Sequence, residues 1–289
     1  MARWHYPGLY TVEEPDAGPS VPLFVDSPHS GREYPADFGS RLPLETLRAA
    51  EDRDVDRLAR RVPVFGGVGL CAHFPRAYID VNRTEQDIDV DMLSAPWPVP
   101  LAPSQKTKLG IGLIRRVTVP GQAIYDRPLS VGEIEQRIAR FHRPYLSAVE
   151  RGLAKLVRIH GRAVHLNLHS MKSVGNAATP DGAVRRPDVV LGDRFGQSCA
   201  AAVTACVRAA FEAAGLSVAV NDPYAGAALL ARFGRPDDGQ HGLQIELNRG
   251  LYMDEQGQTL EHKMGQLIGV IDGVFATMAE HLATPGWPE

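Results

Sequence analysis

The stretch VPLFVDSPHSG at residues 21–31 indicates the fold class of this chain. Its first part, residues 21–26, is an apolar run with the length of a buried strand. The Ser, Pro and Gly residues that follow predict a loop, and His29 lies in it. Open α/β sheets bind their ligands in loops that directly follow such strands. We therefore expect an α/β fold with a ligand site beside His29.

The rest of the chain continues this alternation of strands and helices. Apolar spacing predicts a helix over residues 43–61, and residues 64–81 predict two strands. Ser130 and Glu133 match a capping box, which predicts a long amphipathic helix that ends at Gly161. Further strands are expected at 163–168, 188–191, 216–220 and 243–247, and further helices at 197–214 and 260–282. The alternation predicts a mixed, largely parallel sheet with helices on both faces, in a single domain over residues 1–289.

The composition excludes several classes of protein. Of 289 residues, 44% are hydrophobic and 22% charged, which excludes a coiled coil or a disordered tail. A net charge of -3 offers no basic field for nucleic acid or an anionic membrane. Three cysteines are too few for a disulfide framework, and neither a signal peptide nor a membrane span is expected. We expect a cytoplasmic protein, and its oligomeric state stays open.

Residues 84–128 lack apolar periodicity and contain the proline-rich run APWPVPLAP. So long an irregular loop in a compact protein is usually functional, often as the rim or lid of a site. Common nucleotide-binding and hydrolase motifs are missing: the chain has no G-x-x-x-x-G-K-[ST], no H-E-x-x-H and no G-x-S-x-G. Nucleotide binding, metzincin chemistry and serine hydrolysis therefore have no support from motifs.

Charged residues cluster at two places before this loop. In EDRDVD at residues 51–56, Asp52 and Asp56 share one face of the predicted helix, so one of them can complete a metal site with His29. The alternative for such an acidic run is a solvated helix face.

The second cluster is RAYIDVNR at residues 76–83. On a strand, Asp80 and Asn82 share one face, and Arg83 stands at the strand end. Arginine binds carboxylates through two parallel hydrogen bonds, so Arg76 and Arg83 are candidates for holding an anionic substrate. A structural Asp–Arg pair is the alternative.

Two later strands end with further candidates. His169 follows the predicted strand 163–168. Gln244 and Glu246 alternate with apolar neighbours, so both point to one side of their strand. A buried Glu is costly unless it has a partner or a function, which favours a functional Glu246.

These residue types suit metal-assisted hydrolysis. Two histidines, a carboxylate and an open position for water form a common catalytic zinc site. Zinc lowers the pKa of its water to about 7, and a nearby Glu can pass the proton to a leaving amine. Arginines hold substrate carboxylates or stabilise an oxyanion. We therefore predict hydrolysis of an amide in a small anionic molecule; iron, cobalt or manganese can replace zinc at such ligands.

Seven stretches of the chain resemble the N-formylglutamate amidohydrolase (N-formylglutamate deformylase) family. They are DSPHSGREYP (26–35), EDRDVDRL (51–58), FPRAYIDVNR (74–83), LNLHS (166–170), GDRFGQSC (192–199), NDPYAGA (221–227) and LQIELNRGLYMDE (243–255). Their order and spacing make the resemblance specific. It implies the fold of zinc carboxypeptidases and aspartoacylases, a three-layer αβα arrangement (phosphorylase/hydrolase-like) around a mixed, largely parallel sheet.

The resemblance also implies a metal site. His29 and His169 are expected to bind one zinc ion per chain, with Asp52 as the preferred third ligand and Asp56 in reserve. Glu33 lies one residue beyond the position at which relatives carry their acid.

The remaining roles follow from the same resemblance. The DVNR stretch resembles the Asp-Leu-Asn-Arg motif of relatives, which implies that Asn82 and Arg83 bind the substrate carboxylate. Arg76 is expected to stabilise the oxyanion, Glu246 to act as the catalytic acid–base group, and Tyr224 to line the pocket.

The implied reaction is hydrolysis of N-formyl-L-glutamate to formate and L-glutamate, as in histidine degradation. Met171 and Asp54 differ from the residues that histidine-degrading members tend to carry, so another N-acyl amino acid, or a peptide C-terminus, stays open as substrate. The alternative to an enzyme is a non-catalytic protein that binds small dicarboxylates. The expected partner is a small anionic N-acyl amino acid, with no nucleic acid and no membrane.

Overall fold

The computed structural model describes residues 1–118, 121–175, 179, 181–254 and 256–287. The strands are β1 Ala2–Tyr6, β2 Tyr10–Glu14, β3 Leu23–Ser27, β4 Val68–Ala72, β5 Ala163–Met171, β6 Val189–Gly192, β7 Val218–Val220 and β8 Gln240–Asn248. They form an eight-stranded sheet in the order β1-β2-β4-β3-β5-β8-β6-β7. The β4/β3, β3/β5, β5/β8 and β6/β7 pairs are parallel, and the other three pairs are antiparallel. The predicted mixed, largely parallel sheet is thus confirmed.

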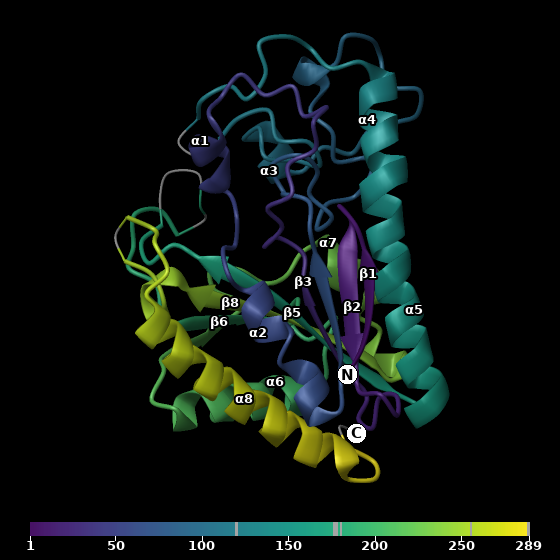
Figure 1. Ribbon diagram of the computed structural model, residues 1–289, viewed down its shortest axis with the longest axis vertical. Helices are drawn as coiled ribbons and strands as arrows, with labels where there is room; N and C mark the ends of the chain where they lie inside the picture. The colour runs from purple at the N-terminus through teal and green to yellow at the C-terminus, as the bar shows by residue number, and fades with distance from the viewer. Residues whose placement is uncertain (119–120, 176–178, 180, 255, 288–289) are drawn as a thin grey trace.

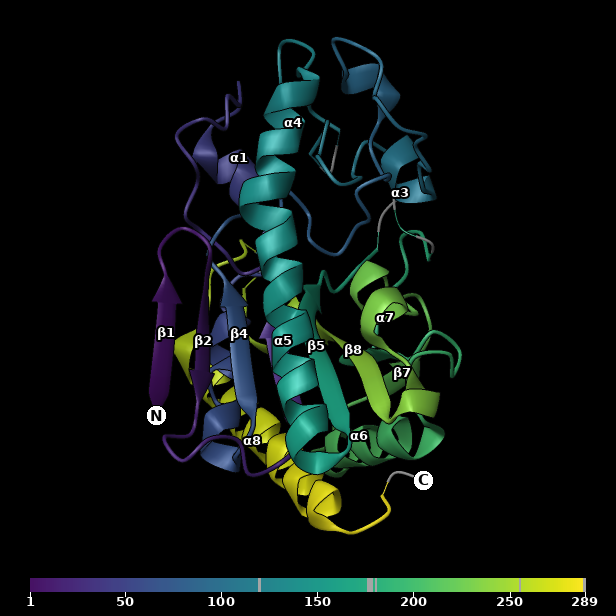
Figure 2. The same ribbon diagram turned by 90° about the vertical axis from the view of Figure 1, so that its right-hand side faces the viewer.

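Helices cover both faces of the sheet. The described α-helices are α1 Leu44–Arg48, α2 Asp56–Ala59, α3 Gln105–Lys108, α4 Val131–Arg137, α5 Arg143–His160, α6 Ala201–Ala213, α7 Ala228–Phe233 and α8 Glu261–Ala283. Helix α5 crosses the strands on one face, whereas α8 and α6 lie on the opposite face (Figure 1 and Figure 2). The predicted three layers are therefore present. Among the described helices, none combines the length and apolar character needed to cross a lipid bilayer.

The longest helical run begins where the sequence predicts it. Glu133 N donates to Ser130 Oγ at 3.2 Å, and Ser130 N donates to the Glu133 carboxylate at 2.8 Å. This is the predicted capping box, which satisfies backbone donors at the helix start. Helix α4 continues through one π-helical turn, Ile138–His142, into α5. Gly161 ends α5 with a φ of 74°, which glycine adopts without a Cβ clash.

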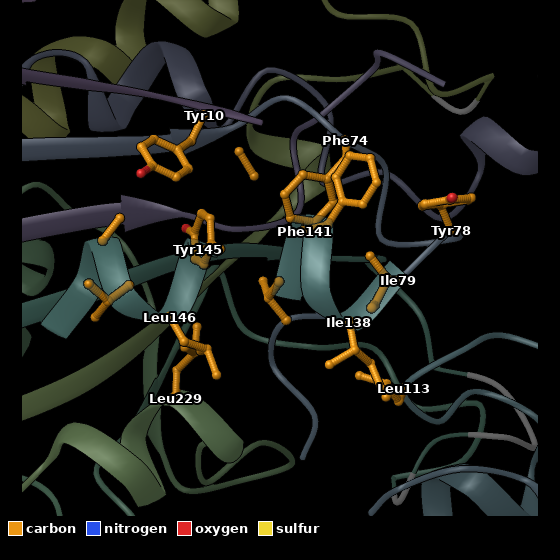
Figure 3. Packing of buried hydrophobic residues seen from close by; sticks show 14 of the residues in the cluster. Tyr10, Phe74, Tyr78, Ile79, Leu113, Ile138, Phe141, Tyr145, Leu146 and Leu229 are labelled. Atoms are coloured by element: carbon orange, nitrogen blue, oxygen red, sulfur yellow. The ribbon is translucent and has the colours of Figure 1, made fainter. Parts of the chain in front are cut away.

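Apolar side chains fill the space between the sheet and α5 (Figure 3). The rings of Phe74 and Phe141 lie 5.2 Å apart at 65° to each other. Leu113 packs into this core near Ile138, so the long segment 84–128 is anchored to the helix.

Strand β5 serves both faces of the sheet because its side chains alternate. Leu166 and Leu168 belong to the core under α6 and α8. His165, Asn167 and His169 therefore point to the opposite face, where β5 carries a buried polar row toward its carboxyl end.

The predicted helix over residues 43–61 is wrong. This segment holds the two short helices α1 and α2, because the backbone turns sharply at Asp54, whose φ is 63°. Such a positive φ cannot continue a right-handed helix. Asp52 lies before α2 begins, so Asp52 and Asp56 do not share a helix face.

The predicted second strand within residues 64–81 is also wrong. All of these residues are described, and the segment contains only β4 as a strand. Beyond β4 the chain forms turns, in which Asp80 Oδ1 accepts a hydrogen bond from Asn82 N at 3.0 Å. The sheet gains instead the hairpin of β1 and β2, which the sequence pattern did not predict.

Candidate metal and substrate site

A cavity of about 410 Å³ opens beside the carboxyl-terminal halves of β5 and β8. All eight predicted site residues line it: His29, Asp52, Arg76, Asn82, Arg83, His169, Tyr224 and Glu246. Parallel strands end at the same edge of a sheet, and this brings segments far apart in the sequence together. A cavity of this volume suits a small molecule.

The loop after β3 is joined to the turn before α2. The Ser30 hydroxyl donates to Asp52 O at 2.8 Å, and Asp52 N donates to His29 O at 3.0 Å. Gly31 packs against the backbone beyond β4, where a Cβ would lie 2.1 Å from Phe74 O. These contacts hold His29 and Asp52 side by side although they come from different loops.

Three atoms of the kind that bind metals converge at this point. His29 Nδ1 and His169 Nδ1 are 3.0 Å apart. Asp52 Oδ2 lies 3.4 Å from His29 Nδ1 and 3.1 Å from His169 Nδ1. All three side chains are buried. Within the part of the chain that the structure describes, this is the one group of His, Cys, Asp and Glu with metal-ligand spacing.

The other ring nitrogen of each histidine has an acceptor as its nearest partner, and Asn82 Nδ2 lies farther from His169 Nε2, at 3.4 Å. His29 Nε2 lies 2.7 Å from Asp80 Oδ1, and a carboxylate only accepts, so this nitrogen carries the proton. His169 Nε2 lies 2.7 Å from Asn167 Oδ1. The Asn167 amide nitrogen donates to Asp26 Oδ1 at 2.6 Å, which turns the amide oxygen toward His169. Each neutral imidazole therefore presents a lone pair at Nδ1.

Two lone pairs and a carboxylate oxygen at this spacing repel one another unless a cation lies among them. Zinc–nitrogen distances of about 2.0 Å in a tetrahedral site separate ligand atoms by about 3.3 Å. The separations here, 3.0, 3.1 and 3.4 Å, agree with that value. Metal-binding histidines usually donate their second N–H to a carboxylate or carbonyl oxygen, as both do here. The three residues thus fit a metal ion.

The second carboxylate oxygen of Asp52 faces two arginines. Arg249 Nη2 donates to Asp52 Oδ1 at 3.2 Å, and Arg76 Nη1 lies 3.5 Å from it. Burial alone would raise the pKa of Asp52, but the positive charge of Arg76 opposes burial, and the pKa lies well below its usual value. Arg249 was not predicted from the sequence; the only signal was its position three residues beyond Glu246, at the end of the same strand.

The two alternative acids lie elsewhere. The Asp56 carboxylate faces Arg32 at 3.5 Å and Arg60 at 3.6 Å. The Glu33 side chain is 56% exposed. Neither belongs to the group of ligand-type atoms around the histidines, so Asp52 is the acid that the structure brings there.

Glu246 lies beside this group because it is paired with His169 in the register of β5 and β8. Gln244 Nε2 donates to Glu246 Oε1 at 3.0 Å. Burial raises the pKa of Glu246; the nearby His169 opposes this rise, and the negative Asp52 adds to it. A carboxylate with a raised pKa on an open cavity is suited to take up and release a proton.

Arg76, Asn82 and Arg83 form the adjoining wall. Arg76 Nη2 donates to Asp80 Oδ2 at 3.0 Å, and its Nε is buried without a partner among the described residues. Asn82 Oδ1 accepts from Leu229 N at 2.9 Å, which ties the turn to the start of α7. Arg83 Nη1 donates to Asn82 O at 2.8 Å.

Tyr224 reaches the cavity from the loop after β7. Gly192 lets this loop lie close to the end of β6, since a Cβ there would be 2.6 Å from the loop backbone. Asn221 Nδ2 donates to Asp193 Oδ1 at 2.7 Å and holds the loop in place. The Arg186 guanidinium lies 5.1 Å from the ring centre of Tyr224.

The chain is similar to known proteins over most of its length. Residues 21–253 match the family model described as N-formylglutamate amidohydrolase. The crystal structure of N-formylglutamate amidohydrolase from Ralstonia eutropha JMP134 superposes with a TM-score of 0.88 at 41% identity, over 95% of this chain and 98% of that one. The N-formylglutamate deformylases of Pseudomonas aeruginosa and Pseudomonas putida are 30% and 27% identical to the present chain. These two matches cover 82% and 81% of this chain, and 84% and 83% of the relatives.

Proposed function

The chain belongs to the N-formylglutamate amidohydrolase family, and we propose that it hydrolyses N-formyl-L-glutamate to formate and L-glutamate with one zinc ion bound. His29, Asp52 and His169 hold the metal in this proposal. The observation that carries it is the convergence of two Nδ1 lone pairs and a carboxylate oxygen beside Glu246.

The metal, when bound, polarises the formyl carbonyl and acidifies a water molecule. Glu246 takes the proton of the attacking water at its carboxylate and then donates it to the departing amide nitrogen, which becomes the amino group of glutamate. The raised pKa of Glu246 brings its proton affinity closer to what both transfers need. Asp80 and Asn167 keep both histidines in the tautomer with a free Nδ1.

The adjoining wall of Arg76, Asn82 and Arg83 binds the substrate in this proposal. Asn82 and Arg83 bind the α-carboxylate, which lies one carbon from the scissile amide. Arg76 stabilises the negative charge that develops on the formyl oxygen, with its unpartnered Nε as the available donor. Tyr224 also lines the cavity.

The test is formate release from a panel of N-formyl and other N-acyl amino acids by the zinc-loaded protein. N-formyl-L-glutamate is expected to be the preferred substrate, with activity lost on chelation and restored by zinc. Glu246→Gln should lower kcat by about 10²–10⁴-fold while the zinc content stays the same. Asp56→Asn is the matched control, because it removes a nearby carboxylate that does not face the histidines.

Each part of the proposal can fail separately. Faster turnover of another N-acyl amino acid or of a peptide would overturn the substrate. Full activity of Glu246→Gln would overturn its role. Absence of turnover with every substrate, together with dicarboxylate binding, would favour the non-catalytic alternative.

A further inference from the structure

Two basic side chains of the segment 84–128 line the cavity without a carboxylate partner. Arg115 is only 7% exposed, and its Nε is buried without a hydrogen bond. The charged groups of Arg115 and Lys106 form no ion pair or hydrogen bond with any residue in the described part of the chain. Both residues nevertheless belong to the cavity wall.

Other arginines of the same wall are neutralised. Arg76 pairs with Asp80 at 3.0 Å, and Arg186 pairs with Asp181 at 2.7 Å. A buried charge without a counter-charge is strongly unfavourable. The Arg115 guanidinium is therefore placed to receive a negative charge that the described residues do not supply.

A short hairpin holds Arg115 in position. Leu113 O accepts from Asp80 N at 2.8 Å, and Leu113 N donates to Asp87 O at 2.8 Å. Ile111 and Arg115 then form an antiparallel bridge. Since Leu113 is also packed in the core under α5 (Figure 3), the hairpin is fixed relative to the wall that contains Asp80.

Asp87, which binds the hairpin at Leu113, also holds the helix that carries Lys106. This helix, α3, is capped by Ser104, whose N and Oγ donate to the Asp87 carboxylate at 2.6 and 3.0 Å. Burial and the charge of Arg83 lower the pKa of Lys106 to about 8. Burial and the charge of Arg76 lower the pKa of Arg115 to about 9. The cavity therefore has an excess of positive charge on this side.

We propose that Arg115, assisted by Lys106, binds the side-chain carboxylate of the substrate and so selects N-formyl-glutamate over N-formyl-glutamine. This inference rests on the proposed function. The proposed function assigns the α-carboxylate of the substrate to Asn82 and Arg83, whose own turn contacts Asp80. The second carboxylate, further along the substrate, is left for the hairpin and α3. A guanidinium binds a carboxylate through two parallel hydrogen bonds, which neutral glutamine cannot match.

The experiment compares kcat/KM for N-formyl-L-glutamate and N-formyl-L-glutamine. Arg115→Met is expected to lower kcat/KM for formylglutamate by about 100-fold and to change that for formylglutamine little. Lys106→Met should cause a smaller loss in the same direction, and Arg115→Lys should retain part of the preference. Arg116→Met is the matched control, because Arg116 pairs with Asp89 at 2.6 Å and is not part of the cavity wall.

An equal loss with both substrates, or no loss with either, would overturn the inference. Calorimetric binding of L-glutamate and L-glutamine separates it from the proposed function. A wild-type preference for glutamate that Arg115→Met abolishes supports the carboxylate site even if no hydrolysis is found. Hydrolysis of formylglutamate with no preference for the charged side chain would leave the proposed reaction standing and remove this inference.

Discussion

Two buried clusters of histidine and aspartate lie along the same face of β5, and their hydrogen bonds differ. In the inner cluster, Asp26, His165, Asn167 and Tyr145, every contact joins a donor to an acceptor. Asp26 accepts from His165 Nε2 at 2.7 Å, from Asn167 Nδ2 at 2.6 Å and from the Tyr145 hydroxyl at 2.8 Å. The negative charge of Asp26 is therefore satisfied by protein groups alone.

The outer cluster, His29, Asp52 and His169, has similar residues and similar burial but the opposite pattern. Two ring nitrogens and a carboxylate oxygen, all acceptors, face one another at 3.0 to 3.4 Å. Asn167 joins the clusters, because its amide donates to Asp26 and accepts from His169. Buried histidine and aspartate are thus weak evidence for a metal site, whereas an unmatched set of acceptors is strong evidence.

Removing one histidine from each cluster is expected to give the largest difference between the two clusters. His169→Ala should eliminate bound zinc and lower kcat/KM by about 10⁴-fold or more, the upper range for loss of one catalytic group. His165→Ala, four residues earlier on the same face, should keep the zinc and lose about 2 kcal/mol of unfolding free energy. Elemental analysis, formate release and urea unfolding measure these effects. Loss of zinc from both variants would contradict the distinction.

The second prediction concerns the charge of the inner cluster. Asp26→Asn places an amide among three donors and should lower the free energy of unfolding by about 3 kcal/mol at neutral pH. Burial alone would raise the pKa of Asp26. The charge of His165, together with the hydrogen bonds that Asp26 accepts from His165, Asn167 and Tyr145, outweighs burial and lowers the pKa from 3.8.

The pH dependence of this effect follows from that shift. A carboxylate with a lowered pKa stabilises the fold above its unfolded-state pKa, near 3.8, and loses this contribution as the pH falls through its folded-state pKa. The stability difference between wild type and Asp26→Asn should therefore be largest above pH 4 and narrow below it. Urea unfolding over a pH series measures the difference, and a constant gap would show that the charge of Asp26 does not matter.

The smallest expected effect comes from the residue that joins the clusters. Asn167→Ala removes the acceptor of His169 Nε2 and should weaken zinc binding by about 10–100-fold. Competition with a chelator measures the affinity. Asn221→Ala is the control, because Asn221 holds the Tyr224 loop and contacts neither histidine. Equal weakening in both variants would show a general loosening of the fold instead of a loss of histidine orientation.

Local patterns predicted the sheet and the long helix well. The apolar run before His29, the alternation in 163–168 and 243–247, and the capping box at Ser130 each depend on neighbours in the chain. The same patterns failed for residues 43–61 and for the second strand expected within residues 64–81. There the backbone turns at Asp54 and around Asp80, and contacts between loops, Asp52 N to His29 O and Asp80 N to Leu113 O, help to hold these turns.

The sequence by itself determined which residue types are candidates for the chemistry and that several of them adjoin strand ends, because hydrophobic periodicity and turn residues are local properties. It left Asp52, Asp56 and Glu33 open as the third metal ligand. Only the tertiary structure decided which acid meets the histidines, which ring nitrogen each histidine presents, and that Arg249 and Arg115 face the same cavity. Those features depend on hydrogen bonds and charges between segments distant in the chain, which no periodicity within one segment encodes.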